Sequence, residues 1–166
     1  MMDAIFSRNS VRKFTEEMPS EEQIERLLRA AMAAPSAKNQ QPWEFFVVTN
    51  KDCLQKLSEA TPYSMCVKNA QAAFVLASRR DGIIAPEFRD IDMAIASENI
   101  LLELEALGLG GVMIGVSPIK ENMEHVRDAL KMKDELIPFT IIPFGYPEKR
   151  RPLEDRYDVS RIHYVK

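Results

Sequence analysis

The chain has 166 residues and a formal net charge of −3 at pH 7, and 46% of its residues are hydrophobic and 28% charged. These values are ordinary for one globular domain, which we expect to span residues 1–166. The net negative charge argues against a general nucleic-acid binder, because such proteins hold the phosphate backbone with clustered cations.

Other functional classes are disfavoured by the cysteines, the histidines and the apolar runs. Cys53, Cys66, His125 and His163 show no metal-binding spacing, so we predict no metal site and expect both thiols to be free. No apolar run is long enough to cross a bilayer, and the N-terminus lacks the apolar core of a signal peptide. We therefore expect a cytoplasmic protein with no membrane partner.

The first predicted elements are two helices. Residues 1–8 form a short helix that leads into a basic segment, and a second helix opens at Ser20. Ser20 and Gln23 have the spacing of a capping box, and Pro35 stops the helix because the residue before a proline is pushed out of the α region. One face of this helix is apolar, with Ile24, Leu27, Leu28 and Ala31 at helical spacing.

Strands and helices alternate in the rest of the chain. We predict a strand at 44–49, a helix at 51–60, a strand at 72–78, a polar connection at 79–87, a helix from 88 or 90 to 107, a strand at 112–116, a helix at 119–131 and a strand at 139–144. At least four strands mixed with helices indicate an α+β or α/β sandwich. The charged tail, residues 148–166, is expected to pack along a neighbour rather than fold alone.

The helix that ends at residue 107 predicts a second subunit. Its apolar residues point in nearly every direction around the helix axis: Met93, Ala94, Ile95, Ala96, Ile100, Leu101, Leu102, Leu104, Ala106 and Leu107. Such a helix must be buried on most of its circumference, and one small domain can hardly surround it. We therefore predict a homodimer with this helix at the interface.

The basic segment from residue 7 to residue 14 is a candidate anion site. Arg8 and Arg12 each present a planar fork of donors that matches phosphate oxygens, and Ser10 adds a hydroxyl between them. The segment can hold a phosphate monoester without a glycine-rich loop. A solvated basic turn is the alternative interpretation, since short motifs often match by chance.

Two further segments suggest a ligand. The polar loop 35–43 carries Ser36, Asn39 and Gln41, whose groups can read the edge of a flat heteroaromatic ring or can cap a turn. Gly115, inside a strand pattern, permits either a bulge or the close approach of a ligand. The glycines at 108–111 follow a helix and precede a strand, which is the reverse of the dinucleotide-binding order.

Four blocks in this order resemble the FMN-dependent nitroreductase family. They are 8–14 (RNSVRKF), 34–43 (APSAKNQQPW), 107–115 (LGLGGVMIG), and 144–147 (FGYP) with 155–157 (DRY). The resemblance covers essentially the whole chain. It implies a nitroreductase-like α+β fold, with a central, mostly antiparallel sheet flanked by helices. It also implies an intertwined homodimer that holds FMN at the subunit interface, with the tail on the partner.

The resemblance also implies which residues bind the cofactor. Arg8, Ser10 and Arg12 would contact the FMN phosphate, ribityl chain and pyrimidine edge, with Asn9 at a neighbouring position that is often Arg or His. Four residues of the partner subunit would approach the same flavin: Pro35, Ser36, Ala37 and Asn39. Ile114 and Gly115 would lie beside the flavin ring, and Arg156 would contact the phosphate.

The activity implied by the resemblance is that of an NAD(P)H-dependent FMN oxidoreductase. It would reduce nitroaromatics, quinones or a related small-molecule acceptor by ping-pong hydride transfer through flavin N5, with no catalytic side chain. Two alternatives stay open. One is a flavoprotein of the same fold with other chemistry, such as flavin cleavage or reductive dehalogenation, and the other is a flavin-binding protein without catalysis.

Overall fold

The computed structural model describes residues 4–150, 152 and 154–166. Its centre is an antiparallel sheet in which β1 (Trp43–Val48), β2 (Ala72–Arg79) and β5 (Leu136–Gly145) lie side by side. Two short strands, β3 (Gly110–Gly111) and β4 (Ile114–Gly115), pair with the other edge of β5. This arrangement confirms the predicted α+β class with a mostly antiparallel sheet.

The strand predicted at 112–116 is confirmed only at Ile114 and Gly115, which form β4. β3 and β4 pair with β5 in one register, which places Val112 opposite Pro143. A proline has no N–H to donate to a ladder. The pairing is interrupted at this point, so Val112 and Met113 belong to no strand.

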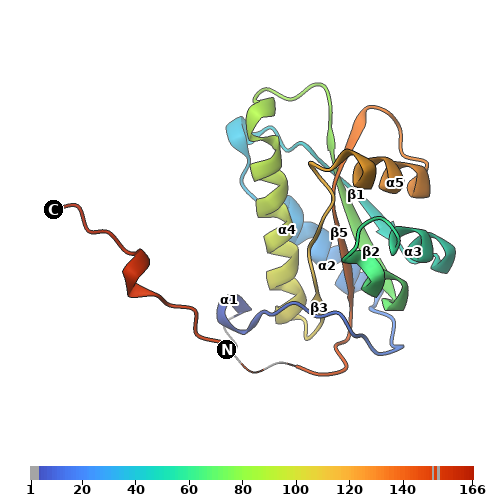
Figure 1. The fold of residues 1–166 in the computed structure, drawn as a ribbon, viewed down its shortest axis with the longest axis horizontal. Coiled ribbons are helices and arrows are strands. Elements are labelled where there is room, and N and C mark those ends of the chain that lie inside the picture. Colours follow the sequence, from blue (N-terminus) through green and yellow to red (C-terminus); the bar gives the residue numbers. More distant parts are fainter. Residues whose placement is uncertain (1–3, 151, 153) are drawn as a thin grey trace.

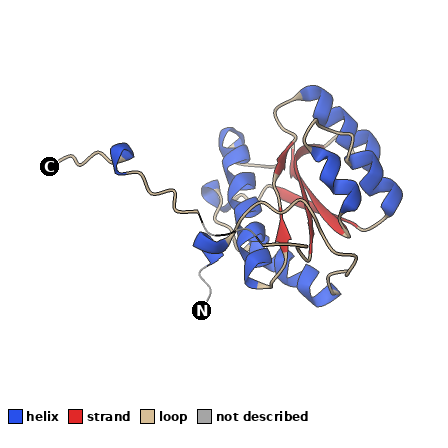
Figure 2. Cartoon of the chain, turned by 60° about the horizontal axis from the view of Figure 1, so that its bottom comes forward, coloured by secondary structure: helices blue, strands red, loops and turns tan. Residues whose placement is uncertain are grey.

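Helices cover both faces of the sheet, as Figures 1 and 2 show. α2 (Glu21–Met32) and α4 (Arg89–Ala106) pack on one face, and α3 (Lys51–Leu57) and α5 (Lys120–Leu130) pack on the other. The shorter helical segments are α1 (Ala4–Ser7), η1 (Ala37–Asn39), η2 (Ser64–Asn69), η3 (Pro86–Phe88) and η4 (Val159–Arg161). The predicted helices are thus present, although the one predicted at 51–60 ends earlier, and residues 1–3 of the first lie outside the described residues.

β2 is buried on both sides, because successive residues of a strand point to opposite faces of the sheet. Phe74 and Leu76 join the core beneath α2 and α4, whereas Val75 joins the core beneath α3 and α5. The Phe74 ring stacks on Phe144 of β5 with 4.6 Å between ring centroids. This double burial explains why residues 72–78 form an uninterrupted apolar run.

α2 begins as its capping residues predict. The Ser20 hydroxyl accepts a hydrogen bond from the Gln23 amide at 3.2 Å, and the Gln23 side chain accepts one from the Ser20 amide at 2.9 Å. Leu27 and Ala31 on the predicted apolar face are fully buried against the sheet. The capping box is therefore confirmed, and it fixes where the helix enters the core.

α4 is only partly covered by its own chain. It buries one side against the sheet and α2, through Met93, Ala96, Ile100 and Leu104. On its other side Ile91 is 56% exposed, and Ile95 and Leu102 are partly exposed. The apolar surface around most of the helix is confirmed, and the second subunit that would cover the outer side stays a prediction.

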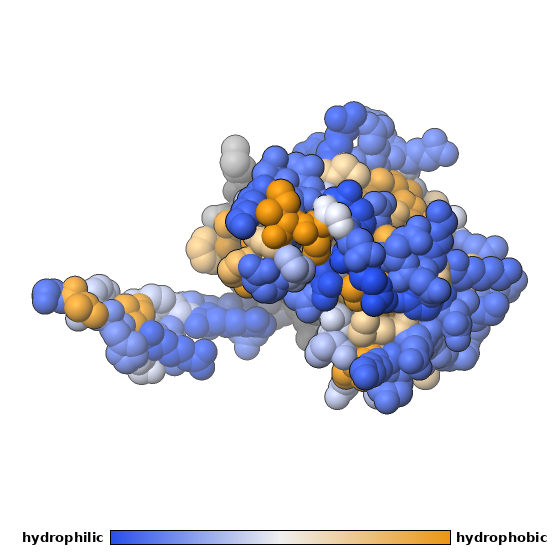
Figure 3. Space-filling view, turned by 90° about the horizontal axis from the view of Figure 1, so that it is seen from above, coloured by the Kyte–Doolittle hydropathy of each residue, from blue (hydrophilic) through white to orange (hydrophobic). Residues whose placement is uncertain are grey.

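The C-terminal tail leaves the body of the molecule (red in Figure 1). Tyr157 and Tyr164 on it are 73% and 77% exposed. Hydrophobic side chains stand out on this segment in the space-filling view of Figure 3. Within the described residues, no helix is both long enough and apolar enough to cross a membrane.

Candidate functional site

The basic segment docks along the β3 edge of the sheet. Ser10 forms a parallel bridge with Gly111, and the Val11 amide donates to the Gly111 carbonyl at 2.9 Å. Further along, the Thr15 amide donates to the Tyr146 carbonyl at 2.9 Å. These bonds hold residues 10–15 as an added edge beside β3 and the end of β5.

Glycines allow this close approach. A Cβ built on Gly110 would lie 2.5 Å from Val11 Cγ2 and 3.0 Å from Val11 Cβ. A Cβ on Gly111 would lie 2.8 Å from Leu104 Cδ1 and 2.9 Å from the Pro143 carbonyl oxygen. Gly110 therefore serves the docking of the basic segment, whereas Gly111 lets β3 pack closely against α4 and β5. Sequence analysis missed both roles because these contacts exist only in the folded chain.

Arg12 and Gly115 line one hollow of about 380 Å³, together with Tyr63, Val112, Met113 and Ile114. Among the described residues, no hydrogen bond or ion pair joins the Arg12 guanidinium. A Cβ built on Gly115 would meet no atom within 4 Å, so this part of the wall is bare backbone facing open space. The hollow thus combines a cation that has no charged partner among the described residues with apolar side chains of Val112, Met113 and Ile114.

The Cys66 thiol lies close enough to Arg12 for the two groups to interact. Burial raises the pKa of the Cys66 thiol, while the positive charge of Arg12 opposes that rise. The thiol is therefore protonated at neutral pH.

A second hollow of about 490 Å³, between α5 and the ends of β2 and β5, is lined mainly by charged groups of both signs and contains none of the predicted site residues.

Arg8 lies beside the middle of α4. The Arg8 Nε atom is 3.5 Å from a carboxylate oxygen of Glu98 on that helix. The Ser7 hydroxyl and the Asn9 side-chain oxygen are buried and have no hydrogen-bond partner within the described part of the chain. Buried polar atoms are rarely left without a partner, so these two atoms are candidates for contacts to a ligand.

The predicted loop residues lie elsewhere in the same chain. The Ala37 amide donates to the Asp92 carboxylate, whereas Arg8 pairs with Glu98, six residues further along α4. Six residues correspond to about 9 Å of helix. One chain therefore does not bring Pro35, Ser36, Ala37 and Asn39 together with the basic segment.

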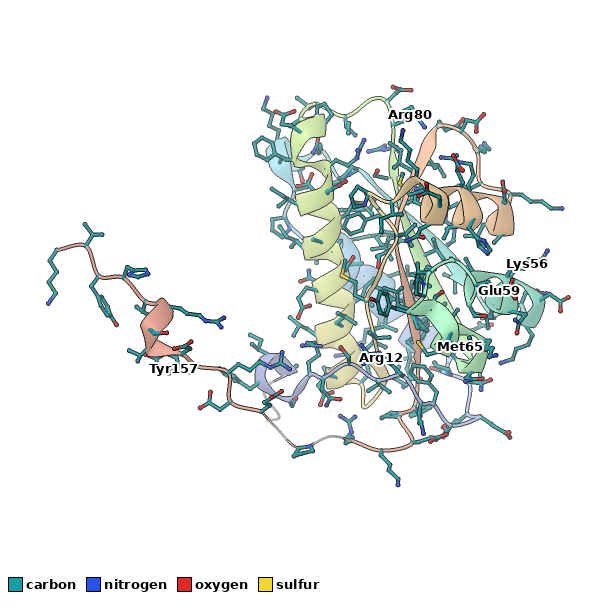
Figure 4. The ribbon with its side chains drawn as sticks, viewed as in Figure 1. Arg12, Lys56, Glu59, Met65, Arg80 and Tyr157 are labelled. Atoms are coloured by element: carbon teal, nitrogen blue, oxygen red, sulfur yellow. The ribbon has the colours of Figure 1, made fainter. Side chains whose placement is uncertain are left out.

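Arg156 is also apart from the other predicted residues. It lies on the exposed tail and pairs with Glu154 at 3.0 Å. Figure 4 shows Tyr157, the next residue, well away from Arg12 near the middle of the molecule. Nearer the body, Arg150 reaches the buried carboxylate of Glu105 on α4 at 2.7 Å. Sequence analysis did not identify this ion pair, because it joins residues 45 positions apart.

A family model described as the nitroreductase family matches residues 5–81 and 61–146. A protein of Methanothermobacter thermautotrophicus, provisionally named NADH dehydrogenase/NAD(P)H nitroreductase, is 39% identical over 166 residues. This match covers 100% of the present chain and 87% of that protein. Sequence similarity therefore extends over the whole length of the chain.

Solved structures match over the same length. The crystal structure of a protein provisionally named NADH oxidase from Clostridium acetobutylicum has a TM-score of 0.96 at 41% identity, and 99% of each chain is covered. An FMN-dependent nitroreductase of Clostridium difficile R20291 has a TM-score of 0.89 at 28% identity, with 100% of this chain and 99% of that chain covered.

Proposed function

The chain belongs to the nitroreductase family, and on that premise we propose that it is an NAD(P)H-dependent oxidoreductase with FMN as its cofactor. Its acceptor would be a nitroaromatic, a quinone or a related small molecule, reduced in a ping-pong cycle after the nicotinamide product has left. The observation that carries the proposal is the hollow lined both by the bare backbone of Gly115 and by Arg12, whose guanidinium has no hydrogen bond or ion pair among the described residues.

The residues of this hollow fit a phosphorylated flavin. Arg12 can donate to an anion or to the carbonyl-rich edge of a ring, and the apolar wall at Val112 and Ile114 suits the flat ring face. The absent side chain at Gly115 leaves room for a ring edge. Arg8 and Ser10 would supply the donors for the phosphate and ribityl chain. The buried Asn9 side-chain oxygen, which no described residue donates to, could accept a hydrogen bond from the cofactor.

The proposed site is completed by a second copy of the chain. Within one chain the loop of residues 36–41 and the basic segment are held at different levels of α4. A partner that covers the exposed outer side of α4 would also bring its own loop, with Pro35, Ser36, Ala37 and Asn39, toward the hollow. The extended tail would pack on that partner, where Arg156 would be placed to reach the phosphate.

The protein's part in the reaction would be binding and positioning. Bound FMN would supply hydride acceptance and donation at N5, for which no side-chain nucleophile is needed. Arg12 would favour negative charge on the ring system by its own charge, a preorganised electrostatic effect. The backbone at Ile114 and Gly115 would orient the ring, and the bare wall would leave space for the nicotinamide and then for the acceptor.

The proposal is tested by absorption spectroscopy and sedimentation of protein purified in excess FMN. We expect a yellow dimer whose flavin band is bleached by NADH or NADPH and restored by a quinone. Arg12→Ala should lose most of its flavin. Lys13→Ala, which removes a neighbouring exposed cation that does not line the hollow, should keep it.

Two outcomes would count against this function. A colourless protein with a single subunit would refute it outright. A yellow protein that NADH and NADPH reduce only slowly would instead favour flavin chemistry of another kind or binding without catalysis.

A further inference from the structure

The loop between α2 and β1 is held in an unfavourable backbone conformation. Lys38, Asn39 and Gln41 have φ angles of 49°, 54° and 44°, in the left-handed region that residues with a side chain rarely adopt. Such strain persists only where the surroundings over-determine the conformation, and it is typical of functional sites. The loop must therefore be fixed by contacts outside itself.

Those contacts come from a buried polar cluster at the start of α4. One carboxylate oxygen of Asp92 accepts the Ala37 amide at 2.8 Å, and the other accepts the Gln40 side-chain amide at 2.6 Å. Gln40 also pairs with both backbone groups of Ala85: its NH2 donates to the carbonyl at 2.9 Å and its oxygen accepts the amide at 2.8 Å. Asp92, Gln40 and Ala85 are 2%, 7% and 1% exposed.

The loop is held from a second direction by Arg79 of β2. Its guanidinium donates to the Gln41 carbonyl at 2.8 Å and to the Gln40 carbonyl at 3.2 Å. The side chains at the tip of the loop, Lys38 and Asn39, are exposed, and within the described ranges neither makes a hydrogen bond or ion pair with the body. The cluster thus fixes the base of the loop and leaves the tip directed at solvent.

We propose that Asp92 and Gln40 are positioning residues that preform the loop for the flavin of a second subunit. This inference rests on the proposed function, in which Ser36, Ala37 and Asn39 approach that flavin. Neither residue would touch the cofactor. Asp92 would act through the Ala37 amide and through Gln40, and Gln40 would tie the loop to the connection before η3.

The variant Asp92→Asn tests the geometry with little change of shape. Its single acceptor oxygen can still serve the Ala37 amide, but its NH2 then faces the NH2 of Gln40, and two donors cannot pair. Adding Gln40→Glu places an acceptor opposite that new NH2. Recovery should be partial, because the Ala85 carbonyl then lacks its donor. Asp90→Asn, at an exposed carboxylate on the same helix, is the matched control.

Two measurements on the full-length protein separate the steps. Hydrogen–deuterium exchange of the flavin-free protein reports on the loop amides of residues 39–41, which are hydrogen-bonded in the structure, with α2 as an internal reference. FMN titration followed by flavin fluorescence reports on binding. If the competent loop is populated one tenth of the time, the apparent Kd rises about tenfold.

We expect Asp92→Asn to speed exchange in the loop but not in α2, and to weaken FMN binding on the order of tenfold. The double variant should lie between it and the wild type, and Asp90→Asn should match the wild type. Unchanged loop exchange, or faster exchange with unchanged FMN affinity, would overturn the inference. Wild-type protein that binds no FMN would refute the proposed function and the flavin role of the loop, while the exchange data would still decide whether Asp92 holds it.

Discussion

Gly110→Ala should displace the basic segment from the sheet. The added Cβ would lie 2.5 Å from Val11 Cγ2 and 3.0 Å from Val11 Cβ, whereas carbon atoms pack best at about 3.5–4.0 Å. Rotation of the Val11 side chain moves its Cγ atoms but not its Cβ atom, so it cannot relieve the contact of 3.0 Å between Val11 Cβ and the added Cβ at residue 110. The backbone of residues 10–12 must therefore move, which weakens the bond of 2.9 Å from the Val11 amide to Gly111.

The magnitude follows from the overlap and the size of the chain. Overpacking of this kind costs about 1–3 kcal/mol. For a chain of this length each kcal/mol lowers Tm by about 2–4 °C, so the flavin-free variant should melt about 2–12 °C below the wild type. Because Arg12 is part of the displaced segment, FMN affinity should fall as well. Thermal unfolding and FMN titration measure the two effects.

A double-variant cycle isolates the contact. Val11→Ala removes the two methyl groups nearest the new Cβ, so Gly110→Ala should be less harmful in the Val11→Ala background than in the wild type. Gly115→Ala is the matched control for unfolding, because its Cβ would meet nothing within 4 Å. If Gly110→Ala melts and binds FMN like the wild type, the docking of the basic segment described here is wrong.

Three other substitutions have expected outcomes. Gly115→Val should leave the melting temperature of the flavin-free protein unchanged but weaken FMN binding far more than Gly115→Ala, because the larger side chain fills the hollow. Equal FMN affinity of the two variants would contradict the placement of the flavin ring beside Gly115. Ser20→Ala should lower stability by about 1 kcal/mol in urea unfolding, since one helix cap is lost. Burial raises the pKa of the Cys66 thiol in the folded protein, so the thiol ionises at lower pH in the unfolded chain than in the folded one. The stability that the protonated thiol contributes is complete below the unfolded pKa. It is lost as pH rises through the higher folded pKa. Cys66→Ala should therefore lose less stability than the wild type above about pH 8.5, and parallel pH profiles would disprove that assignment.

The fold was largely predictable because its signals are local. The capping pair Ser20 and Gln23 and the apolar run at 72–78 each depend on neighbours in the sequence, and the structure places both as predicted. The strand at 112–116 was predicted too long for the opposite reason, since only Ile114 and Gly115 pair. Its interruption depends on Pro143, which lies opposite Val112 only after the sheet has formed.

The candidate site was predictable in part. Two residues that line the hollow, Arg12 and Gly115, carry their signal in residue type, as a planar cation and a missing side chain. The residues that hold such groups in place carry no comparable signal in their residue type. In the sequence, Asp92 looks like an ordinary acidic residue in the first turn of a helix. Only the fold brings its carboxylate to the loop between α2 and β1.

The anchoring of the tail at Arg150 has a practical consequence for anyone who tags or dilutes this protein. Arg150 fixes the start of the tail to α4, and residues 154–166 then run outward, extended except for the helical turn η4. At about 3.3 Å for each extended residue and about 2.0 Å for each residue of η4, this segment reaches at most roughly 40 Å. In the proposed dimer, a reporter fused to Lys166 would lie near the partner subunit rather than near its own. Dilution would separate the subunits and leave the tail uncovered, so a protease should cleave this end first in the most dilute samples.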